Sequence, residues 1–464
     1  MTVAVVGAGI GGLAAAYDLA RAGRRVVVLE ASDHTGGLAS GFKLPRWDWS
    51  VERYYHHWFA SDRHMLALID ELGWSDRVLF PWPTTAVYHQ GRFYPMDAPL
   101  SSLLPLGKWV NRLPAAGTVS RAARVLTFPG LPLAARLRSG LVGFYLTLTR
   151  NWQPLEQYTA DAWLRAKMGS QAYEVLWKPL LEGKFGPHYQ EVNMAWFWAR
   201  VKARTPRLGT YEGGFQAFAD EFSSKLQAMG VDLRLRTAVQ HIEATEGGLE
   251  IQTEAGPLQV DQCLVTTSPS LLARMAPSLP ASYLERLLGL KSMGAVVLIL
   301  ALRQRLSEGG IYWHNLPKQA GFPFLALVEH TNYLSPEFFG GDHIIYCGDY
   351  LDPGHEYFAL TQQELEARFF EALPRFNPSF DPGWVRDSWL FRTPYAQPVP
   401  PVNHSQSIPP LATPLKGLYL ASMSQVYPWD RGTNFAVEIG RRAARLMIEA
   451  GQAGALSGIA VGNR

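Results

Sequence analysis

The chain has 464 residues, and its 43 Lys or Arg residues nearly balance its 40 Asp or Glu residues, which leaves a formal net charge of +3. This balance gives no indication of a nucleic-acid partner, and a hydrophobic fraction of 47% excludes a disordered chain. Two cysteines are too few for a disulfide framework or a four-cysteine zinc site, and no metal site is predicted elsewhere.

The first thirty residues predict a strand, a helix and a second strand. Residues 3–6 are an apolar run, 11–22 have helical periodicity, and 25–30 are rich in Val. This order is the βαβ unit of a parallel sheet. No basic segment with a cleavage site precedes Val3, and no uncharged apolar stretch reaches the about 18 residues of a spanning helix. A cytoplasmic location is therefore expected.

Further elements follow along the chain. A hairpin is expected at 87–94, a helical region at 159–183 and a helix at 215–229. Residues 394–414 are rich in Pro and are expected to be irregular. The other predicted elements are strands at 232–236, 239–244, 249–253, 258–267, 295–302, 324–328, 343–350 and 418–421, and a last helix at 434–450.

A glycine motif joins the first strand to the first helix. Gly7, Gly9 and Gly12 fit the pattern G-x-G-x-x-G, and Gly11 stands beside the last of them. Between a strand and a helix, such glycines permit a tight turn and let the backbone approach the pyrophosphate of a dinucleotide. Glu30 ends the second strand, where a carboxylate accepts hydrogen bonds from ribose hydroxyls and repels a 2′-phosphate, which disfavours NADP.

The residues after Glu30 distinguish FAD from NAD. Ala31 comes next, followed by the pair Gly36-Gly37 and by Leu38. Here the sequence resembles the superfamily of FAD-dependent amine oxidases, protoporphyrinogen oxidases and phytoene desaturases, in which the glycine pair lets a second loop pass along the cofactor. The resemblance implies that these residues contact FAD. The family often has Arg after the pair, and Leu38 resembles its desaturase and nucleotide-sugar mutase branches.

Later segments carry the same resemblance. Residues 211–215 resemble the family's return into the cofactor domain, and Val239 matches the residue that contacts adenine through its backbone. The last strand and helix resemble the segments that close over the flavin ring. Ser422 and Met423 stand where the family has Gly and Asp, so the acidic contact to the ribityl chain is missing or is supplied otherwise, for instance by Asp430.

These features predict an α/β fold with a discontinuous Rossmann-type FAD-binding domain, an antiparallel-sheet substrate domain and a helical insertion. The expected boundaries are 1–75, 208–275 and 416–451 for the FAD-binding domain, 76–95 and 276–415 for the substrate domain, 96–207 for the insertion or cap, and 452–464 for a flexible tail.

Two adjacent histidines are candidates for catalysis. His56 and His57 follow the glycine-pair loop, in a stretch that in the resembling family runs beside the isoalloxazine ring. Histidines here either transfer protons near neutral pH or hydrogen-bond the backbone of a packed loop. Adjacent histidines point apart and no third ligand is evident, so a metal role is not predicted.

A polar segment before the last helix holds further candidates. That helix N-terminus would point to the flavin edge that is negative in the reduced state. Arg431 would add to this stabilisation or bind an anionic substrate, and a surface ion pair of Asp430 with Arg431 is the alternative. Thr433 and Asn434 are predicted cofactor contacts, with capping of the helix as the alternative.

Two lysines and two cysteines complete the candidates. In the amine oxidase branch a Lys reaches flavin N5 through water, so Lys178 and Lys184 are considered, against the alternative of solvated or ion-paired side chains. Residues 395–398 either line the same cavity or form a turn. Neither Cys263 nor Cys347 stands in a motif for a covalent flavin link, so non-covalent FAD is expected.

Residues 98–155 contain no Asp or Glu but seven Lys or Arg, the sharpest change of composition in the chain. This stretch is a cap over the substrate cavity, a surface for peripheral docking on anionic lipid, or an ordinary helical subdomain with Arg on its solvated face.

The sequence therefore predicts an FAD-dependent oxidase or desaturase. It would act by hydride transfer from a bulky, apolar or lipid-like small molecule to flavin, with oxygen or a quinone as electron acceptor. Two alternatives stay open. One is an enzyme like the nucleotide-sugar mutases, without net redox change, which a cluster of Arg and Tyr able to hold a diphosphate would favour. The other is a non-catalytic flavin-binding protein.

Overall fold

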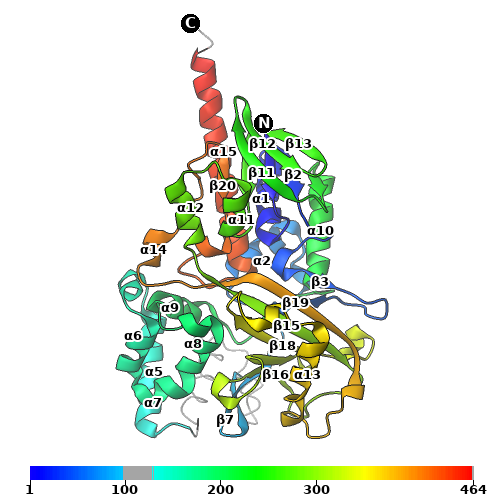
Figure 1. The fold of residues 1–464 in the computed structure, drawn as a ribbon, viewed down its shortest axis with the longest axis vertical. Coiled ribbons are helices and arrows are strands. Elements are labelled where there is room, and N and C mark those ends of the chain that lie inside the picture. Colours follow the sequence, from blue (N-terminus) through cyan, green and yellow to red (C-terminus); the bar gives the residue numbers. More distant parts are fainter. Residues whose placement is uncertain (98–127, 129, 462–464) are drawn as a thin grey trace.

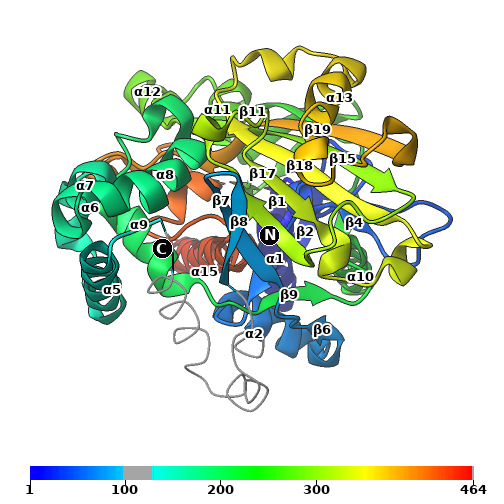
Figure 2. The ribbon, with the colours of Figure 1, turned by 90° about the horizontal axis from the view of Figure 1, so that it is seen from below.

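The computed structural model describes residues 1–97, 128 and 130–461, in which two sheets and a group of helices can be distinguished (Figure 1). A parallel sheet lies at the upper end of the molecule in this view, a larger sheet lies below it, and helices stand beside the larger sheet. Figure 2 shows the same helices to one side of the large sheet. The predicted fold class is confirmed.

The parallel sheet brings together strands from distant parts of the chain. Its order is β10 (Asp232–Arg234), β2 (Arg25–Leu29), β1 (Thr2–Val6), β14 (Gln262–Val265) and β20 (Leu418–Leu420). The helices α1 (Ile10–Arg21), α10 (Phe215–Ala228) and α15 (Thr433–Val461) share a core with Val3, Val5, Val26 and Val28.

The opposite face of the parallel sheet is also covered. Ala4, Val6, Val27 and Leu29 pack with residues of a three-stranded sheet, β11 (Val239–Thr245), β12 (Gly248–Thr253) and β13 (Gly256–Val260). Burial on both faces explains why β1 and β2 are continuous apolar runs rather than alternating ones. The single strand predicted at 258–267 is wrong: β13 and β14 belong to different sheets, and Asp261 separates them.

The second sheet has seven strands. Its order is β19 (Val385–Pro398), β15 (Ser292–Leu302), β18 (His343–Leu351), β17 (Ala326–Glu329), β16 (Ile311–Asn315), β7 (Thr84–His89) and β8 (Arg92–Asp97). Neighbours are antiparallel except β16 and β7. The predicted hairpin at 87–94 is confirmed. Residues 394–398, predicted to be irregular, belong to β19, an edge strand whose pairing with β15 shifts register between Met293 and Ala295, opposite Pro394. Edge strands and bulges are the places in a sheet that tolerate Pro.

The helices beside this sheet come from one continuous part of the chain. They are α5 (Leu133–Leu148), α6 (Ala160–Met168), α7 (Ser170–Ala172), a π-helical turn (Tyr173–Trp177), α8 (Lys178–Phe185) and α9 (Met194–Ala203). The region predicted at 159–183 is therefore helical but broken. The break is at Gly169, whose φ of 90° ends α6.

Shorter elements connect these layers. They are β3 (Gly41–Phe42), β4 (Val51–Glu52), β5 (Trp58–Phe59), α2 (Arg63–Leu72), β6 (Val78–Leu79), β9 (Leu208–Tyr211), α11 (Pro269–Met275), α12 (Ala281–Leu288), α13 (Gln362–Phe370) and α14 (His404–Ser407). The last helix, α15, continues beyond the predicted end at 450. None of the helices in the described part of the chain is long and apolar enough to cross a membrane.

Candidate functional site

The glycine motif forms a tight passage from β1 into α1. Gly7 has a φ of 102°, a conformation that favours glycine. A Cβ atom on Gly12 would lie 2.0 Å from the carbonyl oxygen of Gly7, so only glycine lets α1 begin this close to the strand. Gly9 precedes α1 without a side-chain cap. The N-terminus of α1 is thus open to an anion through its backbone N–H groups.

The glycine-pair loop lies against this motif, as the sequence predicts. Gly36 and Gly9 form a parallel bridge, and the N–H of Gly36 donates to the Ala8 carbonyl at 2.9 Å. A Cβ atom on Gly37 would lie 3.0 Å from the Cα atom of Gly9. Leu38 follows in the 3-10 turn Gly37–Ala39. Two stretches of backbone therefore run side by side.

Glu30 stands where the end of β2 meets these loops. Its carboxylate accepts hydrogen bonds from the N–H of Ala8 at 2.7 Å and of Ser32 at 2.8 Å. Ala31 is exposed beside it. The N–H of Thr237 donates to the Glu30 carbonyl at 2.7 Å, which brings the chain leading to Val239 to the same edge. The chemistry of this group of residues fits a dinucleotide: glycine backbone for phosphate and a carboxylate for ribose.

The start of α15 meets α1 next to the glycine motif. A Cβ atom on Gly440 would lie 2.2 Å from the carbonyl oxygen of Gly11, so the two helices pack at backbone distance. Thr433 Oγ1 accepts a hydrogen bond from Trp58 Nε1 at 2.9 Å, and Asn434 Oδ1 accepts from two N–H groups at the start of α2. Both side chains therefore hold neighbouring elements in place, and their contact with a cofactor stays a prediction.

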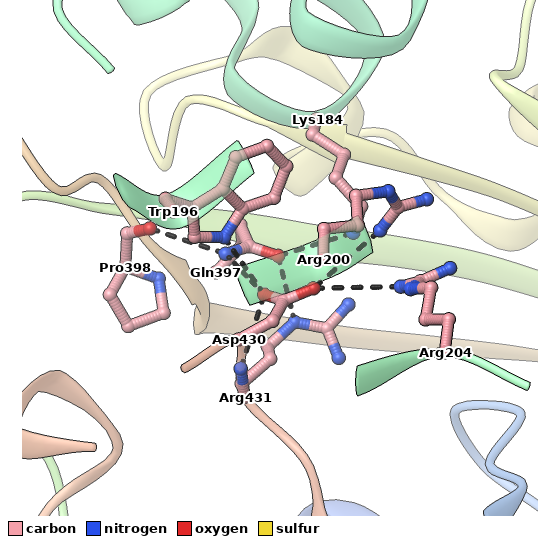
Figure 3. A network of polar contacts seen from close by, with 8 residues as sticks. All are labelled: Lys184, Trp196, Arg200, Arg204, Gln397, Pro398, Asp430 and Arg431. Atoms are coloured by element: carbon pink, nitrogen blue, oxygen red, sulfur yellow. Dashed lines mark hydrogen bonds and ion pairs between the residues drawn. The ribbon is translucent and has the colours of Figure 1, made fainter. Parts of the chain in front are cut away.

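Ser422 and Asp430 lie between β20 and α15. The N–H of Ser422 donates to Gln425 Oε1 at 2.7 Å. Asp430 accepts hydrogen bonds from Trp196 Nε1 at 3.1 Å and from Gln397 Nε2 at 3.3 Å, and it is close to Arg200 at 3.5 Å (Figure 3). Asp430 is therefore part of a buried network rather than a surface ion pair with Arg431, and its contact with a ribityl chain stays a prediction.

The same network contains both the predicted Arg431 and a predicted lysine (Figure 3). Gln397 Oε1 accepts hydrogen bonds from Arg431 Nε at 3.1 Å and from Lys184 Nζ at 3.2 Å. Lys184 and Arg431 also lie over the ring of Tyr350, at 4.7 Å and 4.9 Å from its centroid. Lys178 differs, because it is half-exposed and pairs with Glu174 at 3.0 Å.

Three residues of this network were not singled out by the sequence. Trp196 and Arg200 lie on α9, and Arg204 follows its end. Arg204 approaches Asp430 at 3.5 Å. The spacing of four residues between each of them places all three on one face of a helix, which is the signal that could have identified them.

Burial determines the protonation of the two adjacent histidines. It lowers the pKa of His56 to about 4 and that of His57 to about 3, and in both cases the charge of Arg431 adds to the effect. The Nδ1 atom of His56 is hydrogen-bonded to the Tyr54 carbonyl. The Nδ1 atom of His57 is buried and has no hydrogen-bond partner within the described residues. Both imidazoles are neutral at pH 7.

A small pocket borders the network, and its lining is mostly apolar and aromatic. Trp196, Met423, Tyr427 and Trp429 contribute to it together with Arg431. No group of three or more His, Cys, Asp or Glu that could bind a metal ion occurs in the ranges that the structure describes. The site thus combines a dinucleotide cradle, a polar network and an aromatic pocket.

Comparison with known sequences extends this description. Residues 10–448 match the family model of flavin-containing amine oxidoreductases. Coproporphyrinogen III oxidase of Propionibacterium freudenreichii is 31% identical over 192 residues, which are 41% of this chain and 33% of that protein. The chain thus spans one third of the length of that relative. A protein of Synechococcus elongatus named probable zeta-carotene desaturase is 22% identical over 97% of this chain and 99% of its own.

Solved structures with low sequence identity share the fold. A candidate protoporphyrinogen oxidase of Exiguobacterium superimposes with a TM-score of 0.73 at 17% identity, covering 97% of this chain and 99% of that one. Cyclohexylamine oxidase of Brevibacterium oxydans gives a TM-score of 0.67 at 17% identity over 97% and 99% of the two chains. With the family match spanning nearly the whole chain, the protein belongs to the flavin-containing amine oxidoreductase family of enzymes.

Proposed function

We propose that the protein is an FAD-dependent oxidase or desaturase that binds its cofactor non-covalently and removes a hydride from a bulky, largely apolar small molecule. The observation that carries this proposal is the close approach of Gly9 and Gly37 beside the carboxylate of Glu30. Bound FAD would supply the two-electron acceptor, and oxygen or a quinone would take the electrons onward.

The residues of the chain have distinct tasks in this proposal. The backbone at Gly9 and Gly37 binds the pyrophosphate, Glu30 accepts hydrogen bonds from the ribose, and the backbone at Val239 contacts adenine. The first N–H groups of α15, at Thr433 and beyond, face negative charge on the reduced ring. Neutral His56 and His57 then act as hydrogen-bonding groups and exclude water from the site.

Apolar side chains around the pocket are in keeping with an apolar substrate, whereas the pocket itself, with a volume of about 20 Å³, has room only for a water-sized group. Met423, Tyr427 and Trp429 present apolar surface next to the segment that leads into α15. Such surface favours flat or hydrocarbon groups over small polar ones. The names of the relatives, which include a coproporphyrinogen oxidase and a carotenoid desaturase, are in keeping with such a substrate.

A second candidate function is favoured by one specific observation. Arg200, Arg204 and Arg431 gather near Tyr55, whose pKa burial raises to about 12. Guanidinium groups in such a cluster can hold a diphosphate. An enzyme like the nucleotide-sugar mutases, which completes its reaction without net redox change, would use such a cluster.

The test of the cofactor begins with the visible spectrum of the purified protein. Flavin bands that are released on denaturation are expected, since the FAD is proposed to be non-covalent. A colourless protein that takes up no added FAD would contradict the proposal. After anaerobic reduction, fast reoxidation in air indicates an oxidase, whereas slow reoxidation indicates a desaturase with another acceptor or a mutase.

A matched pair of variants tests the glycine loops. Gly37→Val places a side chain against Gly9, whereas Gly91→Val alters a glycine of similar positive φ, at the tip of the β7–β8 hairpin, with no atom within 4 Å of its Cβ position. We expect Gly37→Val to lose FAD and Gly91→Val to retain it, as measured by absorbance and by the released flavin. Equal retention by both would contradict the assignment.

Peripheral contact with a membrane is a further part of the proposal. One face of α5 exposes large apolar side chains, among them Leu137, Leu141 with 71% of its surface exposed, Phe144 and Leu148. No acidic residue occurs anywhere in α5. An apolar face on a helix free of negative charge suits an anionic lipid surface. Part of the stretch 98–155, including Lys108, lies outside the described residues.

Vesicle binding tests this contact. The FAD-loaded protein should sediment with vesicles of phosphatidylcholine and phosphatidylglycerol, and less with phosphatidylcholine alone. Leu141→Asp should reduce sedimentation, whereas Leu288→Asp, at a comparably exposed leucine of α12, should not. Loss of binding in both variants, or in neither, would contradict a role for α5.

A further inference from the structure

Four cationic side chains gather around Asp430 and Gln397 in the network of Figure 3: two of them approach Asp430 and two bind Gln397. Lys184 comes from α8, Arg200 from α9, Arg204 from the residue after α9, and Arg431 from the segment before α15. The carboxylate at their centre is Asp430. We call these four side chains the cation cluster.

The cation cluster is well shielded from solvent. The side chain of Arg200 is 15% exposed and that of Asp430 is 12% exposed, and Lys184 is buried. Burial lowers the pKa of Lys184 and of Arg200 well below their usual ranges, and it lowers the pKa of Arg431 to about 10. The protein therefore keeps several cations where their charge is costly.

The negative charge nearby does not balance these cations. Asp430 is the carboxylate within ion-pair distance of Arg200 and of Arg204. Asp62 also acts on Arg204, but burial raises the pKa of Asp62 to about 6. Even with Lys184 neutral and Asp62 ionised, three guanidinium groups face two carboxylates. With all three arginines protonated, one positive charge remains in excess over these two carboxylates.

One donor of the cation cluster is buried without a hydrogen bond. Arg200 Nη1 lies 3.5 Å from Asp430 but makes no hydrogen bond to any residue of the described chain. The Cζ atom of Arg200 also lies over the ring of Trp196, at 5.8 Å from its centroid. A buried guanidinium N–H that makes no hydrogen bond is a position that an oxygen of an anion can take.

The cation cluster also adjoins the groups expected at the reacting centre. Arg431 is two residues before the start of α15, and its charge acts on Tyr55, His56 and His57. The aromatic pocket shares Trp196, Asp430 and Arg431 with it. A molecule bound beside Trp196 and Arg431 would therefore meet both aromatic surface and the cation cluster.

We propose that the cation cluster binds a carboxylate or phosphate group of the substrate, so that the substrate is an amphiphile with an apolar body and an anionic end. This inference rests on the proposed function, since it assigns the substrate class of the same site. Arg200 and Arg204 present planar donors suited to two oxygens of one anion, and Lys184 and Arg431 orient Gln397 beside them.

The test measures anion binding to the FAD-loaded protein with oxidised flavin. The probes are inorganic phosphate and hexanoate, each titrated at constant ionic strength set by chloride, with calorimetry and melting temperature as readouts. Saturable binding is expected, with at least a tenfold loss of affinity in Arg200→Gln and in Arg204→Gln. The control Arg442→Gln, at an exposed arginine of α15, should bind as the wild type does. Arg204→Lys retains the charge and should keep part of the affinity even if the glutamine variants fail to fold.

Three outcomes would overturn the inference. One is wild-type protein that binds neither probe. The second is equal binding by wild type, Arg200→Gln and Arg204→Gln. The third is unchanged anion binding together with a lowered flavin midpoint potential in the variants, which would mean that the cation cluster serves the reduced flavin instead. Failure of the proposed function is separate: a protein without FAD would disprove that function, whereas anion binding dependent on Arg200 and Arg204 would still support the anion site.

Discussion

Asn434, in the first turn of α15, accepts a hydrogen bond from the backbone N–H of His64, at the start of α2, with a distance of 2.8 Å. The N–H of Met65 donates to the same oxygen at 3.1 Å. The residue before α2, Asp62, makes no side-chain cap of its own. One helix therefore supplies the N-cap of another, and the two ends that meet at the candidate flavin site are fixed to each other.

Removal of this shared cap should weaken both helix ends. Asn434→Ala is expected to lower the free energy of unfolding by about 1 kcal/mol, the typical value of an N-cap, and also to weaken FAD binding. The control Thr361→Ala removes the N-cap of α13, whose Leu365 and Phe369 pack against the seven-stranded sheet, and should lower stability without affecting FAD. Thermal unfolding and flavin titration measure the two effects. If Asn434→Ala and Thr361→Ala bound FAD with equal affinity, the cap at Asn434 would have no role in FAD binding.

Buried Glu52 should make stability depend on pH. Burial raises its pKa from 4.5 to about 7, since only one oxygen accepts a hydrogen bond, from the N–H of Phe215 at 3.2 Å. The folded state then binds more protons than the unfolded state between pH 4.5 and 7, so stability falls as pH rises through this window. Glu52→Gln should remove this loss and gain at most about 3 kcal/mol at pH 8. Denaturant unfolding of the wild type and of Glu52→Gln at pH 5 and pH 8 shows whether the free energy of unfolding falls with rising pH and whether the variant removes that fall.

His57 should have the opposite effect. Its pKa of about 3 in the folded protein lies below the ordinary value of 6.5, so the unfolded state binds more protons between these values and stability falls as pH falls. His57→Gln is expected to reduce the loss of stability between pH 6.5 and 4. Because the windows of Glu52 and His57 overlap with opposite signs, unfolding curves of the single variants and of the double variant are needed. If His57→Gln instead lost more stability than the wild type between pH 6.5 and 4, His57 would be protonated in the folded protein.

Replacing a helical glycine by Ala should lower the stability of the protein at one position and raise it at another. Gly440→Ala places a Cβ atom 2.2 Å from the Gly11 carbonyl oxygen and should cost about 1–3 kcal/mol by overpacking. Gly140→Ala, in the middle of α5, meets no atom within 4 Å and should gain up to about 1 kcal/mol from helix propensity. Melting temperatures decide between these signs. Destabilisation by both variants would mean that α5 is not a helix.

The parts of the candidate cofactor site that the sequence predicted are local. Gly7 to Gly12 and Glu30 lie within one βαβ unit, where a strand, a turn and a helix follow each other and the periodicity of side chains is sufficient. The break at Gly169 was missed because apolar residues continue with helical spacing on both sides of it. The separation of β13 from β14 was missed because only sheet pairing, and not composition, distinguishes them.

The cation cluster could be predicted only in part. Arg431 was recognised from its place before the last helix, and Arg200 and Arg204 share a spacing of four residues that also occurs on ordinary solvated faces. The hydrogen bond between Lys184 and Gln397 joins residues 213 positions apart, and no pattern in the sequence connects them. Such contacts arise from how α8 and β19 pack, which depends on the entire fold.

The pairing of β1 with β14, and of β14 with β20, has a consequence for how the enzyme is made. In the sequence, β1 lies far before β14 at 262–265, with which it pairs, and β20 at 418–420, which pairs with β14, comes later still, followed by α15. Contacts between such distant segments form slowly, because a long loop must close before they form. The sheet around the glycine motif is therefore complete only after β14, β20 and α15 have joined it, and the proposed cofactor site depends on contacts between segments far apart in the sequence.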